Sequence, residues 1–243
     1  MIFHIGPIVY RLGHNVFNVG SGVRLPVGSQ MKKIVIFDMD GVLVDTIEDA
    51  YKNVLLSHPS MTRQEYGQLH AENYHEAIAK YRLINPPIVV SPEEHAIRTA
   101  AYTLQKSQSS LFPGMRELLE KLKNDGYIVI LNTSAYEHNS FPLLERTDIK
   151  KFFDMLGTAE ISKNKVDKFK IIIEKYQVDE NDILFITDAI GDINEAAVVN
   201  IPTVAVTWGV HTANDFNKDN HENLVSIVDS PSKLEEFIEN RWK

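Results

Sequence analysis

The sequence IVIFDMDGVLVD, residues 34–45, decides the fold that we expect. Its first four residues are apolar and mostly β-branched, which is typical of a short strand buried on both faces within a parallel sheet. Asp38 and Asp40 follow where that strand should end, and residues two apart in an extended chain point to the same side. Gly41 then allows a sharp turn of the backbone and the close approach of a ligand. The stretch therefore predicts a central strand that ends in two converging carboxylates.

Two acids at the end of a buried strand have no packing role, because crowding like charges costs free energy unless a cation offsets it. The alternative is a solvated turn, since an aspartate followed by glycine commonly reverses a chain. Residues elsewhere in the chain are needed to distinguish an acidic functional site from an ordinary turn.

Further apolar runs predict buried strands at 127–131, 183–186 and 203–206, with a shorter strand near 154–156. Between them, helical patterns follow Gly114 and cover about 139–147 and 166–176. Alternation of strands and helices predicts an α/β fold, namely a doubly wound, Rossmann-like parallel sheet with helices on both faces.

A long helical segment separates the first strand from the others. Segments 46–57, 62–81 and 92–108 have helical spacing, and Ser91 followed by Pro92 is a good helix start. The strand signal between them is the short run 88–90. We therefore predict a helical cap at 46–110, inserted into a core formed by 31–45 and 111–243.

Residues 1–30 differ from the rest of the chain, because they contain no acidic residue and five glycines interrupt any periodicity. Gly6, Pro7 and Arg11 break the apolar run that a signal peptide would need. We expect an extension that is disordered or an artefact of an upstream start. A β-rich addition around 8–10 and 16–17 is the alternative.

Composition excludes several classes of protein. With 25 basic and 33 acidic residues the net charge is −8, and no basic run suggests a nucleic-acid surface. No stretch approaches the about 18 apolar residues of a membrane span. The chain has no cysteine, which excludes disulfides, thiolate metal sites and a cysteine nucleophile. We expect a cytoplasmic protein, and the sequence leaves its oligomeric state open.

Polar residues follow each of the long predicted strands. In open α/β sheets, ligands bind beyond the carboxyl ends of the strands. Acids gathered there pair best with a hard divalent cation such as Mg²⁺, and a hydroxyl and a lysine beside them suit a phosphoryl group. Each residue taken alone has an ordinary explanation as a helix cap or a surface lysine. The candidates are Asp38, Asp40, Thr133, Ser134, Lys163, Lys165, Asp188 and Asp192.

This ordered set resembles the haloacid dehalogenase superfamily, and in particular its capped phosphatases, which are similar to phosphoglycolate phosphatase and beta-phosphoglucomutase. The first motif of that family, hhhhDxDGhhhD, matches residues 34–45 throughout. The second is a Ser or Thr after a strand, which is Thr133 here, although Asn132 stands where many members place the hydroxyl. The resemblance covers residues 31–243.

The other two motifs match less closely. The third motif is a lysine before a helix and falls on Lys165, with Lys163 possible, and Val166 replaces the usual proline. The fourth matches at Asp188 and Asp192, with Thr187 in place of a glycine.

The resemblance implies a Mg²⁺-dependent phosphatase that acts on a small-molecule phosphate ester through an aspartyl-phosphate. Asp38 would be the nucleophile and Asp40 the general acid and base. Asp38, Asp188 and Asp40 through its backbone carbonyl would hold Mg²⁺. Thr133, Ser134 and Lys165 would bind the phosphoryl group, with Asp192 behind them.

Other activities have to be weighed against this one. A dehalogenase needs neither Asp40 nor the pair Asp188 and Asp192, and a receiver domain lacks the helical insert. A sugar-phosphate mutase uses the same motifs and stays open from sequence. A non-catalytic binding module on the same fold is a further alternative, which the intact set of acids and Lys165 disfavours.

Overall fold

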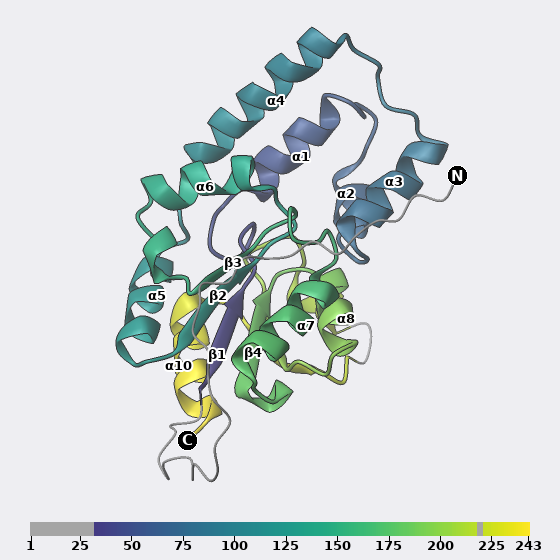
Figure 1. The fold of residues 1–243 in the computed structure, drawn as a ribbon. Helices are drawn as coiled ribbons and strands as arrows, with labels where there is room; N and C mark the ends of the chain where they lie inside the picture. Colours follow the sequence, from purple (N-terminus) through teal and green to yellow (C-terminus); the bar gives the residue numbers. More distant parts are fainter. Residues whose placement is uncertain (1–31, 218–220) are drawn as a thin grey trace, which may run out of the picture. The chain divides into compact units, whose positions relative to one another are not determined.

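The central strand of the fold is β1, Ile34–Phe37, in a computed structural model that describes residues 32–217 and 221–243. Six parallel strands form one sheet in the order β3-β2-β1-β4-β5-β6 (Figure 1). The chain builds outward from β1 to β3 and then returns to place β4 on the other side of β1. The doubly wound parallel sheet predicted from the sequence is confirmed, and its switch point lies beside β1.

The elements follow one another along the chain with short connections. The strands after β1 are β2 (Ile128–Asn132), β3 (Met155–Gly157), β4 (Ile183–Thr187), β5 (Thr203–Val206) and β6 (Leu224–Val228). The helices that pack on the sheet are α5 (Met115–Asn124), α6 (Glu137–Arg146), α7 (Lys165–Tyr176), α8 (Ile190–Ala197), α9 (Ala213–Phe216) and α10 (Pro231–Arg241). Strand β6 and helix α10 were not predicted from the sequence.

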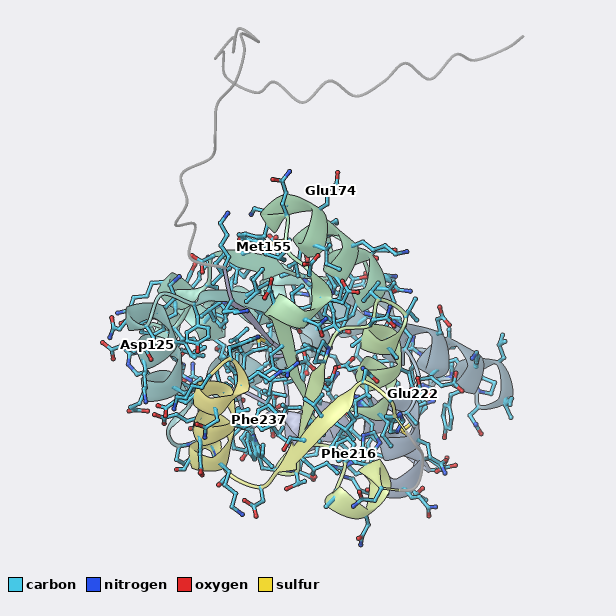
Figure 2. The ribbon with its side chains drawn as sticks, turned by 90° about the horizontal axis from the view of Figure 1, so that it is seen from below. Asp125, Met155, Glu174, Phe216, Glu222 and Phe237 are labelled. Atoms are coloured by element: carbon cyan, nitrogen blue, oxygen red, sulfur yellow. The ribbon has the colours of Figure 1, made fainter. Side chains whose placement is uncertain are left out.

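Both faces of the sheet are covered, because successive side chains of each strand point to opposite faces. Val35 and Phe37 of β1 pack with α5, α6 and α10, whereas Ile34 and Ile36 pack with α7 and α8. Figure 1 shows α5 and α10 on one side of the sheet and α7 and α8 on the other. In Figure 2, Phe237 of α10 lies beside the sheet, while Asp125 and Glu174 lie at the periphery. Burial on both faces explains the unbroken apolar run of β1.

Residues 46–110, here called the helical insert, contain α1 (Ile47–Leu55), α2 (Arg63–Leu69), α3 (Tyr74–Ile84) and α4 (Pro92–Ser107). Ser91 caps α4 as predicted, since its hydroxyl accepts a bond from the Glu94 N–H at 3.1 Å. One sequence expectation for the insert was wrong, because the segment 62–81 is divided between α2 and α3 where Asn73 begins a new helix. The short apolar run 88–90 forms no strand, as expected of a helical insert.

The insert leaves and rejoins the sheet at one point. Val44 and Leu111 form an antiparallel bridge, and the Asp45 N–H donates to the Ser110 carbonyl at 3.0 Å. The described residues belong to one compact unit. None of the helices in residues 32–217 and 221–243 has the length and apolar character needed to cross a bilayer. The predicted extension, residues 1–30, lies outside the described residues.

Candidate active site

Strand register brings the predicted polar residues to one edge of the sheet. Phe37 pairs with Leu131 of β2 on one side and with Ile186 of β4 on the other. Asp38 therefore begins the loop after β1 at the level where β2 and β4 also end. Thr133 and Asp188 follow those neighbouring strands, and both line the same cavity as Asp38.

Asp38 and Lys165 form a buried ion pair, in which Lys165 Nζ lies 3.0 Å from Asp38 Oδ2. The other carboxylate oxygen of Asp38 accepts the Met39 N–H at 2.7 Å. Lys165 stands at the start of α7, where Asn164 caps the helix. Lys163, the alternative from the sequence, is exposed and does not line the cavity. Of the two candidate lysines, the fold brings Lys165 to the strand ends.

Asp192 shares the ammonium group of Lys165. Its Oδ2 accepts bonds from Lys165 Nζ at 2.5 Å and from the Thr187 hydroxyl at 2.6 Å. Burial by itself raises the pKa of Asp192, but Lys165 and Thr187 outweigh burial and leave that pKa below its usual value. Burial likewise acts to lower the pKa of Lys165, while Asp192 and Asp38 raise it above its ordinary range. The lysine is therefore held as a cation.

Asp38 is held less firmly as an anion. Burial raises the pKa of Asp38 to about 7, and the carboxylates of Asp192 and Asp40 add to that rise. Lys165 opposes the shift, but it divides its charge between two acids. The strand end thus concentrates more negative charge than the protein's own cations offset.

Asp188 has no lysine or arginine partner within the described ranges. Its Oδ2 accepts the Val210 N–H at 2.7 Å, and its exposed fraction is 2%. Burial and the nearby Asp38 raise the pKa of Asp188 well above its ordinary value. The backbone packs closely around it, since a Cβ on Gly41 or Gly209 would fall 2.0 or 2.1 Å from Asp188 Oδ2. The sequence predicts that a ligand lies close to Gly41, but the group that lies close to Gly41 in the structure is the side chain of Asp188.

The oxygen atoms at this edge could hold a divalent metal ion. Asp38 and Asp188 are buried carboxylates, and Asp188 has no lysine or arginine partner in the part of the chain that the structure describes. Oxygen donors are what a hard divalent cation prefers. Among the described residues, no three His, Asp or Glu side chains gather as a metal-binding group. The site made of Asp38, Asp188 and the backbone carbonyl of Asp40, which would use two side chains, stays a prediction.

Asp40 is held from both ends of the helical insert. Its Oδ1 accepts the hydroxyl of Thr46, which begins α1, at 2.5 Å. Its Oδ2 accepts Lys106 Nζ, from the last turn of α4, at 2.7 Å. The exposed fraction of the Lys106 side chain is 3%, and that of Asp40 is 25%. The orientation of the Asp40 carboxylate therefore depends on the insert.

Thr133 and Ser134 both line the cavity, whereas Asn132 does not. Asn132 is fully buried in β2, and neither atom of its amide group has a partner among the described residues. The carbonyl of Thr133 accepts a bond from Lys168 Nζ at 2.6 Å, and Lys168 is itself buried. Burial and the charge of Lys165 lower the pKa of Lys168 to about 8. Lys168 thus fixes the loop that carries Thr133 and Ser134.

A cavity of about 230 Å³ joins the strand ends to the insert. The most polar stretch of the insert offers Arg63, His70, Asn73 and His75 as candidates to contact a substrate, and of these His70 and His75 line this cavity. Arg63 instead lies over the rings of Tyr51 and Tyr66. Asn73 caps α3, and its Nδ2 donates a hydrogen bond to Glu195 Oε1 at 2.9 Å.

Sequence reasoning missed Lys106, Lys168 and the tyrosines of the cavity. A buried lysine has no local signal, because its spacing within α4 or α7 is that of an ordinary surface lysine. One signal was available for the tyrosines, since Tyr66, Tyr74 and Tyr102 all lie in a segment predicted to stand over the site.

Several known proteins are similar to this chain in sequence and in fold. A family model described as "Haloacid dehalogenase-like hydrolase" matches residues 35–206. A phosphoglycolate phosphatase of Nitrosospira multiformis is 23% identical over 222 residues, which are 83% of this chain and 95% of that protein. A phosphorylated carbohydrates phosphatase of Thermotoga maritima is 27% identical over 198 residues, which are 74% and 87% of the two chains. The crystal structure of a predicted phosphatase from Clostridium acetobutylicum has the same fold, with a TM-score of 0.66 at 21% identity over 86% of this chain and 99% of that one.

Proposed function

Because this chain belongs to the haloacid dehalogenase-like hydrolases and is a phosphoric monoester hydrolase, we propose that it hydrolyses small phosphate esters with Mg²⁺ through an aspartyl-phosphate on Asp38. One observation carries the proposal. Asp38 is paired with Lys165 in the same cavity in which Thr46 and Lys106 bond the Asp40 carboxylate.

In the first step, a carboxylate oxygen of Asp38 attacks phosphorus, and the bond between phosphorus and the ester oxygen breaks. The leaving oxygen takes the electron pair of that bond and a proton from the Asp40 carboxyl group. Lys165 and the hydroxyls of Thr133 and Ser134 bind the phosphoryl oxygens, where negative charge has to be stabilised.

In the second step, Asp40 takes a proton from water, and the water oxygen attacks phosphorus of the aspartyl-phosphate. The bond to the Asp38 oxygen breaks, which restores the carboxylate and releases inorganic phosphate. Thr46 and Lys106 keep the Asp40 carboxylate in one orientation for both transfers. Asp192 holds Lys165 in place throughout.

Asp38, Asp188 and the Asp40 carbonyl would hold Mg²⁺, whose charge offsets the repulsion between a carboxylate nucleophile and an anionic ester. The helical insert would act as a cap that excludes water from the strand ends. The relatives named above act on phosphoglycolate or on phosphorylated carbohydrates, which supports a small phosphorylated metabolite as substrate. A cytoplasmic location stays a prediction.

The proposal is tested with purified protein and a panel of phosphate monoesters, by measuring inorganic phosphate with and without Mg²⁺. We expect release of phosphate from several small esters. A sugar-phosphate mutase would instead return an isomeric sugar phosphate and little free phosphate, and a binding module would release none.

Removal of the metal is expected to stop turnover. Chelation should abolish phosphate release and Mg²⁺ should restore it, with Ca²⁺ a poor substitute because its larger and more flexible coordination misplaces the carboxylates. Saturating Mg²⁺ should also raise the thermal unfolding temperature by roughly 5 °C, since it binds the folded state. Asp188→Asn should lose that rise and Asp125→Asn, on an exposed residue, should retain it. Full turnover in excess chelator would refute the metal assignment.

Lys106→Met tests the contact between the insert and Asp40. We expect kcat for alkyl phosphates to fall about 10- to 100-fold, because an unanchored Asp40 carboxylate is misplaced for proton transfer. Lys52→Met, on an exposed lysine of α1, is the matched control and should change kcat by less than about twofold. Equal kcat values in the parent and in Lys106→Met would show that the contact has no part in turnover.

A further inference from the structure

The part of the cavity away from the strand ends is lined mainly by aromatic side chains. Tyr66, Tyr74 and Tyr102 come from three helices of the insert, and Tyr136 precedes α6 of the core. Ile47, Ala50 and Val54 add apolar surface from α1. An apolar, aromatic wall opposite a phosphoryl site is the place where the leaving group of an ester would lie.

The rings of this wall form a continuous row. The ring centroid of His70 lies 5.0 Å from that of Tyr66 and 4.9 Å from that of Tyr74. His75 continues the row, with its centroid 6.0 Å from Tyr74 and 6.3 Å from Tyr136. Tyr66 is 1% exposed, whereas Tyr74 and Tyr136 are half-buried, so the rings of Tyr74 and Tyr136 offer surface on which another ring packs favourably.

The wall also presents polar atoms that have no partner in the protein. Within residues 32–217 and 221–243, the hydroxyls of Tyr66, Tyr74, Tyr102 and Tyr136 form no hydrogen bond, and His70 Nε2 is buried without one. Buried polar groups normally have partners, so His70 Nε2 is suited to bond a hydroxyl group of a bound molecule, and the unpartnered tyrosine hydroxyls beside it can do the same. Burial and His211 lower the pKa of His70 to about 4, which leaves its imidazole uncharged near neutral pH.

No cation of the cavity is free for a second anion of the substrate. Among the described residues that line it, the two lysines are Lys106, bound to Asp40, and Lys165, bound to Asp38 and Asp192. The remaining charged side chains of the lining are acids, including Glu72. A carboxylate or a second phosphate on the leaving group would lose its water without gaining an opposite charge, which is costly.

We propose that the substrate is the phosphate monoester of an uncharged, ring-bearing alcohol, whose ring packs on Tyr74, Tyr102 and Tyr136 and whose hydroxyls bond to the polar atoms of this wall. The inference rests on the proposed phosphatase activity and narrows its substrate class. Esters of hydroxy acids and bisphosphates are poor substrates for the same site.

The test uses three esters that differ only at the far end of one ring: benzyl phosphate, 4-(hydroxymethyl)benzyl phosphate and 4-carboxybenzyl phosphate. Their leaving groups are similar alcohols, so kcat/KM compares the cavity's preference for charge. We expect the carboxylate to lower kcat/KM about 10- to 100-fold, which is the range for a buried charge left unpaired. Ethyl phosphate, which has no ring, should also be a poorer substrate than benzyl phosphate.

A variant with an added cation provides the complementary test. Asn53 lines the cavity from α1, and Asn53→Lys should raise kcat/KM for the 4-carboxybenzyl ester relative to the benzyl ester by about tenfold. Asn85→Lys introduces the same charge at an exposed end of α3 outside the cavity lining and should leave that ratio unchanged.

The possible outcomes separate the two hypotheses. If phosphate is released equally fast from the benzyl and carboxybenzyl esters by the parent protein, the preference for an uncharged ring is wrong and the phosphatase activity stands. If ethyl phosphate matches benzyl phosphate, the ring has no role. If no ester of any kind is hydrolysed in Mg²⁺, both the proposed function and this inference are overturned.

Discussion

Asp38→Asn is expected to abolish hydrolysis of every phosphate ester, with kcat on the order of 10⁴-fold lower or more. An amide at this position lacks the anionic oxygen that attacks phosphorus, and no aspartyl-phosphate can form. The fold should survive, because the amide has the size of the carboxylate and Lys165 keeps its second partner, Asp192. We expect the thermal unfolding temperature to shift by less than about 4 °C.

Asp45→Asn is the matched control for this substitution. Asp45 belongs to the same motif but is exposed, so the same chemical change there should alter kcat by less than about twofold. Phosphate release and intact-mass measurement after rapid acid quench check both variants, since the parent enzyme should trap a phosphorylated form that Asp38→Asn cannot make. Activity near the parent level in Asp38→Asn would show that Asp38 is not the nucleophile.

Asp40→Asn is expected to slow the hydrolysis of alkyl phosphates about 10²- to 10⁴-fold and that of aryl phosphates much less. An alkoxide needs a proton as it leaves, whereas a phenolate leaves readily without one. The amide oxygen can still accept a bond from Thr46 or Lys106, so the side chain should stay in place. The aryl phosphates serve as the control for the alkyl phosphates, because both are measured with the same variant.

The measurement is kcat for a series of esters whose leaving groups differ in pKa, in the parent and in Asp40→Asn. A steeper dependence on the leaving-group pKa in the variant supports proton donation by Asp40. Equal losses for alkyl and aryl esters would mean that Asp40 acts on the metal or on the structure instead.

Local signals in the sequence were sufficient to predict the sheet and much of the site's membership. Buried parallel strands are continuous apolar runs bounded by polar residues, and this pattern by itself places Asp38, Thr133 and Asp188 at strand ends. Strand β6 was not predicted, because its burial is uneven and Ser226 interrupts its apolar run. The division between α2 and α3 was not predicted, because the helical spacing of apolar residues continues across the break.

Tertiary structure decided which of two candidate residues close together in the sequence faces the site. Lys163 and Lys165 are two residues apart, and sequence spacing treats them alike. The capped start of α7 exposes one and buries the other against Asp38. Similarly, Thr133 rather than Asn132 lines the cavity, because the pairing of β2 with β1 and β3 leaves Asn132 inside the sheet.

The sequence by itself determined the elements whose cause is local: the central strand, the two acids that end it, Gly41, and the helix start at Ser91. Only the tertiary structure decided how distant segments meet, since a contact such as that between Lys106 and Asp40 joins residues 66 positions apart and depends on where α4 ends above the sheet. The same holds for the tyrosines of the cavity wall, which come from three insert helices and one core segment. Propensity and periodicity act over a few residues, whereas the charge and shape of the cavity are set by the packing of helices against strand ends.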